Sequence, residues 1–217
     1  MTNQVKQELV RVPAKFPSLN NALGGGLPEG RLLEIYGPSQ MGKTLLCISM
    51  VEDTPTVIFD VDRKLTGNYL NKIDTNNNLI INQDINNDEL FDATEELIKL
   101  DGIVIIDSLP LLGDHLNGDS ERFKWLTSRF SRVQRLLLKT KSIVIVINGI
   151  RSNPATGATY NPHAGVLDPA VRIKMHTADN TPDKYRLVYL DIEHNFWNKE
   201  STRCTLRVFK NEIKERR

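Results

Sequence analysis

Four short apolar runs occur along the first two thirds of the chain, and their hydrophobic positions are nearly continuous rather than alternating. They are rich in β-branched residues and cover Arg31–Gly37 (RLLEIYG), Thr56–Asp62 (TVIFDVD), Gly102–Ser108 (GIVIIDS) and Ser142–Gly149 (SIVIVING). Runs of this kind are typical of strands that are covered on both faces, as in a parallel sheet. The pattern therefore predicts four strands of a buried parallel sheet.

Segments with helical character lie between these runs. They are expected at Lys43–Glu52, Asp88–Leu100 and Ser120–Lys141. Strands that alternate with helices indicate a doubly wound α/β sheet with right-handed crossover connections. The predicted fold class is therefore α/β, with a mainly parallel central sheet flanked by helices.

The character of the chain changes after residue 150. Arg151–Pro169 is rich in Gly, Pro, Asn and Thr and lacks periodicity, which predicts a long loop of a kind that is often functional. Val171–Met175, Tyr185–Glu193 and Thr202–Phe209 then alternate between apolar and polar positions, which predicts antiparallel strands at a sheet edge. No internal repeat or linker divides the sequence, so residues 1–217 are expected to form a single domain.

The composition is that of an ordinary globular protein. Hydrophobic residues make up 40% and charged residues 25% of the 217 residues. The net charge of +1 excludes a whole-chain field that attracts nucleic acid, so any basic site must be local. Cys47 and Cys204 indicate neither a disulfide framework nor a zinc site. No signal peptide is evident, and no apolar run approaches the roughly 20 residues that span a bilayer, so a soluble, cytoplasmic protein without a membrane partner is expected.

The segment GPSQMGKT matches the phosphate-binding pattern G-x-x-x-x-G-K-[ST] and follows a predicted strand just before a predicted helix. In such a loop, backbone N–H groups and the start of the helix face the phosphates. Lys43 is expected to neutralise the β- and γ-phosphates, and Thr44 Oγ to bind Mg²⁺. The candidate nucleotide-binding residues are Gly37, Pro38, Ser39, Gln40, Met41, Gly42, Lys43 and Thr44.

Asp107 ends the apolar run GIVIIDS. A carboxylate at the end of a buried strand can reach the metal from the side opposite the phosphate loop. The alternative is an ordinary helix cap at the end of a strand. Because the phosphate loop is present, we favour the metal role, with Thr44 and Asp107 as the predicted Mg²⁺ ligands.

With these motifs in this order, the chain resembles a RecA/RadA-type recombinase core over nearly its whole length. The resemblance is carried by LNNALGGGLPEGRLLEIYGPSQMGKT, TVIFDVDRKLTGNYLNKI, GIVIIDSLPLL, IVIVINGIR and RVFKNEI. It implies a RecA-like P-loop NTPase core that uses ATP and Mg²⁺, binds single-stranded DNA and acts as a DNA-dependent ATPase. It also implies self-association into a filament or ring with ATP between subunits.

The resemblance assigns further residues to the nucleotide. Asp62 stands where the family has a glutamate that orients the attacking water, and it is one methylene shorter. The alternative for Asp62 is a solvated or capping acid. Tyr69 matches an aromatic residue that stacks on adenine, although a buried structural tyrosine is also open. Lys210 matches a lysine that reaches a neighbouring subunit's nucleotide, and its alternative is an ordinary surface lysine.

Two positions depart from the family pattern. Gly149 stands where the family has a glutamine that senses the γ-phosphate and signals to the DNA loop, with Asn148 as a candidate substitute. Glu212 stands at the position of a second trans-acting lysine. The resemblance also leaves little room for the family's N-terminal oligomerisation domain and C-terminal DNA-gathering domain. It therefore favours a compact protein of phage or mobile-element type, in a bacterial or phage-infected cell, with other recombination or replication proteins as further partners.

The resemblance places single-stranded DNA at two segments, Leu112–Asp119 and Arg151–Asp168. The first segment is not basic, whereas the second offers hydroxyls, amides and an aromatic ring that can contact phosphates and bases. A surface loop without a partner is the alternative. The candidate DNA-binding residues in the second segment are Arg151, Asn153, Tyr160 and His163.

The predicted helix Ser120–Lys141 carries seven basic residues and no acidic one from Arg122 to Lys141. Arg129 and Arg132 are candidate DNA-binding residues on its polar side, since a solvated face usually mixes signs of charge. A subunit contact or a solvated face remains open. The apolar positions expected to face the core are Phe123, Leu126, Phe130, Val133 and Leu137, and those on the opposite side are Arg129, Arg132, Arg135 and Lys139.

Three functions are thus open. The first is an ATP-dependent recombinase or annealing protein that binds single-stranded DNA and hydrolyses ATP at subunit interfaces. The second is a nucleotide-binding regulatory or assembly module with weak or no hydrolysis, which the departures at Asp62, Gly149 and Glu212 favour. The third is a helicase-like motor, ranked lower because the residues around the phosphate loop and RVFKN resemble the recombinase branch.

Overall fold

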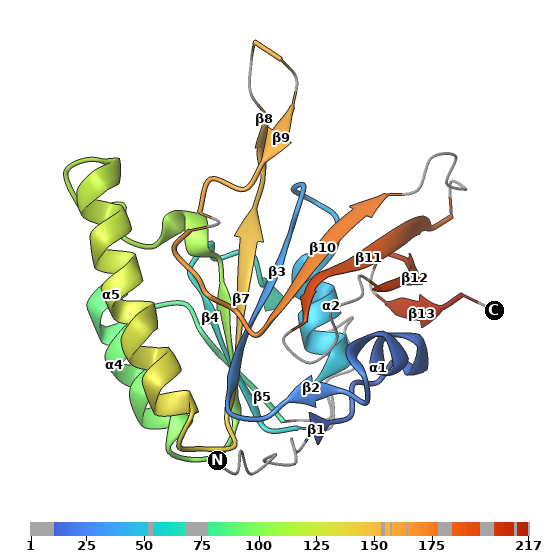
Figure 1. Cartoon of the computed structure of the whole chain (residues 1–217), viewed down its shortest axis with the longest axis horizontal. Helices are drawn as coiled ribbons and strands as arrows, with labels where there is room; N and C mark the ends of the chain where they lie inside the picture. The colour runs from blue at the N-terminus through green and yellow to red at the C-terminus, as the bar shows by residue number, and fades with distance from the viewer. Residues whose placement is uncertain are drawn as a thin grey trace, which may run out of the picture.

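A central nine-stranded sheet organises the chain (Figure 1). The computed structural model describes residues 11–51, 54–67, 78–152, 155–156, 158–163, 165–177, 184–195, 202–210 and 212–216. The strand order is β13-β12-β11-β10-β3-β7-β6-β4-β5. The strands are β3 (Arg31–Gly37), β4 (Thr56–Asp60), β5 (Leu79–Asn82), β6 (Ile103–Asp107), β7 (Ile143–Gly149), β10 (Val171–Thr177), β11 (Arg186–Asn195), β12 (Thr202–Val208) and β13 (Ile213–Glu215).

Helices cover both faces of this sheet. Helices α1 (Pro17–Leu23) and α2 (Lys43–Met50) pack on one face, and their buried residues join one hydrophobic cluster. Helices α4 (Asn87–Ile98) and α5 (Asp119–Leu137) pack on the other face in a second cluster (Figure 1). This arrangement confirms the predicted α/β fold with a mainly parallel, helix-flanked sheet.

The parallel part of the sheet runs from β5 through β4, β6, β7 and β3 to β10. All residues of β6 are buried, as its continuous apolar sequence predicts. Strand β5 was missed by the sequence analysis because its four residues form a short, partly exposed edge. Strands β4 and β6 also end earlier than predicted, at Asp60 and Asp107, which are paired in the sheet.

The second half of the sheet is antiparallel from β10 through β11 and β12 to β13. Buried and half-buried positions alternate along β10 and β11, which matches the predicted pattern. The structure corrects one expectation, because β10 is not an edge strand. It pairs in parallel with β3 and antiparallel with β11, so it joins the two halves of the sheet.

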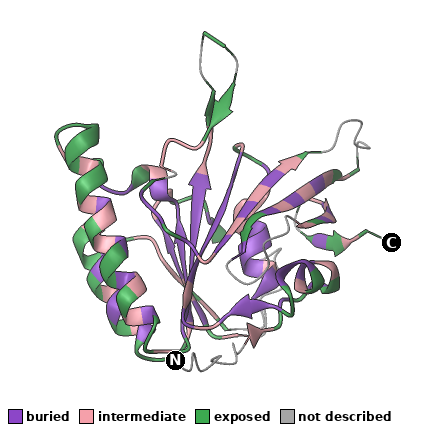
Figure 2. Ribbon diagram, in the orientation of Figure 1, coloured by how far each residue is buried: buried purple, intermediate pink, exposed green. Residues whose placement is uncertain are grey.

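The predicted long loop after residue 150 contains a small hairpin. Strands β8 (Arg151–Ser152) and β9 (Thr159–Tyr160) pair with each other and project from the body beyond β7 (Figure 1). All four strand residues are exposed (Figure 2). A second small sheet pairs β1 (Arg11–Val12) with β2 (Leu27–Pro28).

Helix α5 departs from expectation at its start and at its end. It ends at Leu137 rather than Lys141, and Phe123 is 45% exposed instead of facing the core. The other predicted core positions, Leu126, Phe130, Val133 and Leu137, are fully buried. Among the helices of the described residues, none combines the length and apolar character needed to cross a membrane.

Candidate nucleotide-binding site

The phosphate loop joins β3 to α2 at the carboxyl edge of the parallel strands, where ligands of open α/β sheets bind. Glycine is required at two of its positions. A Cβ at Gly37 would lie 2.2 Å from the carbonyl oxygen of Met175 on the neighbouring strand β10. Gly42 has a φ of 87° and precedes the first residue of α2, so it turns the chain into the helix in a left-handed conformation.

Lys43 folds back over the loop. Its Nζ donates to Gly37 O at 2.9 Å and to Pro38 O at 2.7 Å. Burial lowers the pKa of Lys43 below its ordinary value, while the nearby Asp107 opposes this shift. A partly desolvated ammonium whose hydrogen bonds within the described residues go to carbonyl oxygens is suited to donate to phosphate oxygens, which are stronger partners.

Thr44 and Asp107 meet at the start of α2 and the end of β6. Thr44 Oγ1 donates to Asp107 Oδ2, and Asp107 is 3% exposed. Burial raises the pKa of Asp107 to about 6, and the negative charges of Asp62 and Asp60 act in the same direction. A hydroxyl oxygen and a carboxylate are the ligand types that Mg²⁺ prefers, so the predicted metal pair fits the ion.

Asp62 lies in the turn after β4 and is not a solvated acid, because its side chain is only 6% exposed. Its Oδ1 accepts a hydrogen bond from Ser108 Oγ at 3.1 Å, and its Oδ2 pairs with Lys64 Nζ. Its backbone N–H lies 3.3 Å from Asp107 O. The structure thus brings the predicted base next to the predicted metal pair, and it adds Lys64, which the sequence analysis had not assigned.

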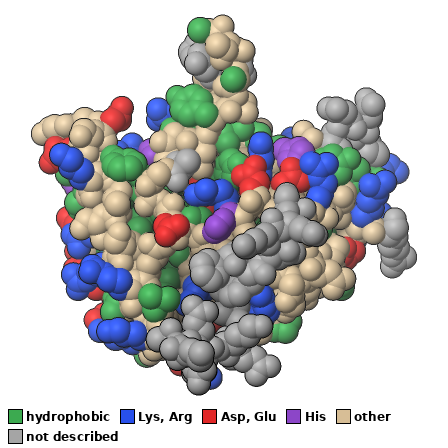
Figure 3. All heavy atoms as spheres, in the orientation of Figure 1, with side chains coloured by type: hydrophobic (Ala, Val, Ile, Leu, Met, Phe, Trp, Pro, Cys, Tyr) green, Lys and Arg blue, Asp and Glu red, His purple; other side chains and the backbone are tan. Residues whose placement is uncertain are grey.

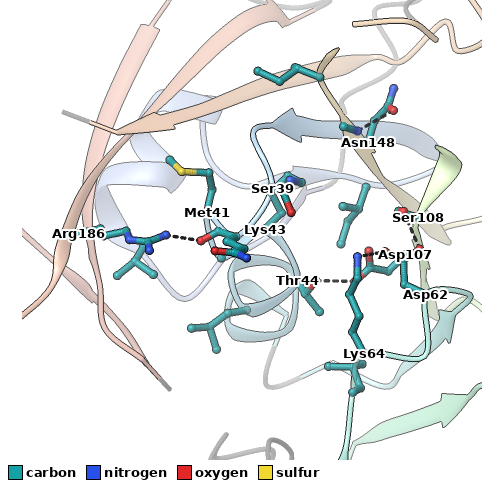
Figure 4. A pocket seen from close by; sticks show the side chains of 18 of the residues that line it. Ser39, Met41, Lys43, Thr44, Asp62, Lys64, Asp107, Ser108, Asn148 and Arg186 are labelled. Atoms are coloured by element: carbon teal, nitrogen blue, oxygen red, sulfur yellow. Dashed lines mark hydrogen bonds and ion pairs between the residues drawn. The ribbon is translucent and has the colours of Figure 1, made fainter. Parts of the chain in front are cut away.

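These groups line one cavity of about 1000 Å³, which we call the nucleotide cavity (Figure 4). One wall is the phosphate loop from Ser39 to Thr44, and the floor carries Asp62, Lys64, Asp107 and Ser108. A further part of the lining comes from the start of β11 and the end of β12, and it lies against the phosphate loop. Its lining residues are Lys184, Tyr185, Arg186, Val208, Phe209 and Lys210.

This part of the lining, beside the phosphate loop, is cationic and aromatic. Arg186 donates to Gln40 O of the phosphate loop, and the rings of Tyr185 and Phe209 lie 5.4 Å apart. Lys210, which the sequence analysis expected at a neighbour's nucleotide, is exposed and lines the cavity of its own chain. Sequence reasoning missed Arg186 and Tyr185 because no motif marks them. Tyr69, the predicted base-stacking residue, lies outside the described residues.

Asn148 at the end of β7 belongs to a buried polar network. Its Nδ2 donates to Glu34 Oε1 at 2.8 Å and to Asn161 Oδ1 at 2.9 Å. Asn161 Nδ2 also donates to Glu34 Oε1, at 2.8 Å, and Arg172 Nε donates to Glu34 Oε2 at 2.6 Å. Since Asn148 and Gly149 line the nucleotide cavity, this network joins the cavity to the base of the β8–β9 hairpin.

The predicted DNA-binding residues of the hairpin region lie at different places. Arg151 and Tyr160 are exposed on the hairpin, Tyr160 by 51%. His163 lies at the hairpin base and is half-buried, and burial together with Arg122 and Arg151 lowers its pKa. Asn153 lies outside the described residues.

The structure corrects the interpretation of α5 as an uncompensated basic stripe. Arg129 pairs with Asp88 and lies 3.9 Å from Asp92, both on α4. Arg132 pairs with Glu95 of the same helix at 2.7 Å. Basic and acidic side chains are interspersed on the face shown over this region (Figure 3). Acidic residues of α4, which are distant in sequence, thus supply the negative charge that α5 lacks after its first turn.

Comparisons with known proteins identify the family of the chain. The sequence profile described as the RecA N-terminal domain matches residues 1–168. The chain is 28% identical to Protein RecA of Mycoplasma mycoides over 195 residues, which is 78% of this chain and 56% of the relative. It is 32% identical to Protein RecA of Caulobacter vibrioides over 165 residues, which is 67% of this chain and 46% of the relative. The chain therefore spans about half the length of these relatives.

A solved structure gives an independent view of the fold. The structure described as the RadB recombinase superposes with a TM-score of 0.74, at 18% sequence identity. The match covers 93% of this chain and 97% of that chain. At this level of identity the likeness shows a shared fold alone. The family model and the RecA relatives, together with this fold, confirm the RecA/RadA-type core expected from the motifs.

Proposed function

Because the chain belongs to the RecA N-terminal domain family, we propose that it is an ATP-dependent, single-stranded-DNA-binding protein of recombinase or annealing type. The observation that carries the proposal is the nucleotide cavity. It brings the phosphate loop, the Thr44–Asp107 pair and Asp62 together on one edge of the sheet. This combination provides a phosphate cradle, a metal site and a carboxylate for the attacking water.

Each residue has a defined task in this proposal. Lys43 exchanges its loop carbonyl partners for phosphate oxygens, and Thr44 and Asp107 hold the magnesium ion. Bound Mg²⁺ supplies positive charge that neutralises the phosphates during transfer. Asp62 accepts a proton from, or orients, the attacking water, and Ser108 fixes the orientation of its carboxylate.

The β8–β9 hairpin is the proposed DNA contact. Arg151 can pair with phosphate, and the exposed ring of Tyr160 can stack on a base. The ion pairs of Arg129 and Arg132 with α4 leave the hairpin as the better-supported DNA site. The network from Glu34 through Asn161 anchors the hairpin to the sheet next to the nucleotide.

The direct test measures ATP turnover with and without single-stranded DNA at low salt, because contacts to phosphate weaken steeply as salt rises. We expect the wild type to bind single-stranded DNA and to hydrolyse ATP faster in its presence. We expect Tyr160→Ala to lose this stimulation. Electron microscopy with DNA and a non-hydrolysable ATP analogue then shows whether the assembly is a filament or a ring. Neither DNA binding nor any effect of DNA on turnover would refute the proposal.

The subunit that uses Lys210 can be identified by mixing two inactive variants. We propose a homo-oligomer in which Lys210 reaches the neighbour's nucleotide, although Lys210 also lines its own cavity. If Lys210 acts on the neighbour, mixed assemblies of Lys43→Ala and Lys210→Ala chains contain some intact sites and regain turnover. If Lys210 serves its own cavity, mixing restores nothing, and the interface role is wrong.

A second function, a nucleotide-dependent assembly module with weak hydrolysis, is favoured by one set of observations. Both carboxylate oxygens of Asp62 already have partners, Gly149 has no side chain, and Glu212 pairs with Lys214 at 2.7 Å. Asp62→Asn separates the two functions. A large fall in turnover supports an ATPase, whereas negligible wild-type turnover that the variant leaves unchanged supports the assembly module.

A further inference from the structure

The turn after β4 carries two adjacent cationic residues, Arg63 and Lys64, whose side chains lie in different surroundings. The buried carboxylate of Asp60 fixes this turn, because it accepts from the backbone N–H of Lys64 at 3.1 Å and of Leu65 at 2.8 Å. Arg63 adopts a left-handed φ of 52° and lies 3.3 Å from Asp84, away from the residues that line the nucleotide cavity. Lys64 instead lines that cavity, so the turn itself directs one cation inward and its neighbour outward.

The ammonium of Lys64 lies among the groups that would handle the phosphates. Its side chain extends from the turn toward Asp62, Asp107 and Thr44 (Figure 4). It pairs with Asp62 Oδ2, and its charge also acts on Asp107 and on Lys43. A cation at this position faces the same cavity as the phosphate-loop lysine, Lys43.

The Lys64–Asp62 pair is unequal in its exposure to solvent. The Asp62 side chain is 6% exposed, whereas the Lys64 side chain is 67% exposed. A largely exposed lysine stem can change rotamer at low cost, while the carboxylate is held by Ser108 and by its backbone. The ammonium is therefore the mobile member of the pair, and a phosphate group that enters the cavity can compete for it.

We propose that Lys64 is a second phosphate-binding lysine, supplied by the same chain as Lys43, which leaves Asp62 for the terminal phosphate of a bound nucleoside triphosphate. The inference rests on the proposed nucleotide site and deepens it. Charge-assisted hydrogen bonds to phosphate are strong, and a diphosphate lacks the terminal group that Lys64 would contact. Lys64 therefore discriminates triphosphate from diphosphate, and its departure frees Asp62 for water only when a triphosphate is bound.

The test is calorimetric binding of Mg-ADP and of a Mg-bound, non-hydrolysable ATP analogue. Lys64→Ala is expected to weaken the triphosphate analogue about tenfold, as one lost charge-assisted hydrogen bond predicts, with less than about a threefold effect on ADP. Lys64→Arg is expected to retain most of the discrimination. The matched control is Arg63→Ala, the adjacent cation outside the cavity, which is expected to change neither affinity.

A double variant separates direct phosphate contact from mere neutralisation of Asp62. If Lys64 contacts phosphate, Asp62→Asn combined with Lys64→Ala still binds the triphosphate analogue weakly. If the double variant recovers wild-type affinity for the analogue, Lys64 acts only through Asp62 and the inference is overturned. Equal weakening of both nucleotides, or no weakening, in Lys64→Ala also overturns it. Wild-type protein that binds neither nucleotide would instead refute the proposed nucleotide site.

Discussion

Replacing Glu34 with Gln is expected to be strongly destabilising, because this carboxylate holds together parts of the chain that are far apart in sequence. Glu34 is completely buried on β3. Its two oxygens accept from three donors, Asn148 and Asn161 at 2.8 Å each and Arg172 at 2.6 Å. Glutamine has the same shape, but it removes the negative charge and turns one acceptor into a donor that faces other donors.

The expected loss of stability follows from the ion pair between Glu34 and Arg172. Removing one partner of a buried ion pair costs about 3–5 kcal/mol, since the other charge stays behind without compensation. The Arg172 side chain is 24% exposed, so water partly solvates its charge and the lower end applies. We therefore expect a loss of about 3 kcal/mol in the free energy of unfolding. In a domain of this size, that loss corresponds to a fall of about 6–12 °C in Tm.

The assay is urea and thermal denaturation at neutral pH, with Glu193→Gln as the matched control. Glu193 lies on β11, accepts from Tyr36 Oη and is 36% exposed, so its replacement should cost about 1 kcal/mol or less. The effect of Glu34→Gln should also persist at high salt, because buried pairs are poorly screened. A Tm within about 2 °C of the wild type, or equal losses in the two variants, would show that the network does not stabilise the fold as argued.

Three other predictions concern the cavity and the helices. In metal-free buffer, folding raises the pKa of Asp107 to about 6, so the folded chain holds this proton more tightly than the unfolded chain does. The resulting stabilisation is complete below about pH 4 and is lost as pH rises through 6. Between pH 5 and pH 7, wild type should therefore lose about 1 kcal/mol of unfolding free energy relative to Asp107→Asn in urea titrations, and no difference would contradict the raised pKa. Gly37→Ala should lower Tm and abolish nucleotide binding in calorimetry, because its Cβ would lie 2.2 Å from Met175 O; a normal Tm would contradict this contact. Arg132→Ala should lower the free energy of unfolding by about 1 kcal/mol without weakening single-stranded-DNA binding in a fluorescence titration, and a selective loss of DNA affinity would restore the basic-stripe hypothesis.

Four strands of the parallel part, β3, β4, β6 and β7, could be predicted because their signal is local. Each buried strand is a continuous apolar run, and the helices between them repeat at helical spacing. The position of β10 could not be predicted in this way. Its alternating pattern reflects one covered face, and that pattern is the same whether the neighbouring strand runs parallel or antiparallel.

The motif-bearing half of the site was predictable for a similar reason. Gly37–Thr44 is a contiguous motif, and Asp107 follows an apolar strand, so each has a recognisable local context. Lys64 and Arg186 have none. Arg186 reaches the phosphate loop only because β10 and β11 place residue 186 beside residue 40. The pairing of Arg132 with Glu95 was hidden for the same reason, because it depends on how two helices pack.

Each charged group that we assign to Mg-ATP in the cavity is already held by another group of the chain. Lys43 is held by loop carbonyls, Asp107 by the hydroxyl of Thr44, and Asp62 by Lys64. In each case, a charged group has a partner from the chain that is weaker than, or different from, the one that Mg-ATP would provide. Burial lowers the pKa of Lys43 and raises that of Asp107, so both charges are poorly solvated. Ligand binding would replace these partners without new burial of charge, which makes the site suited to a nucleotide that arrives together with its metal ion.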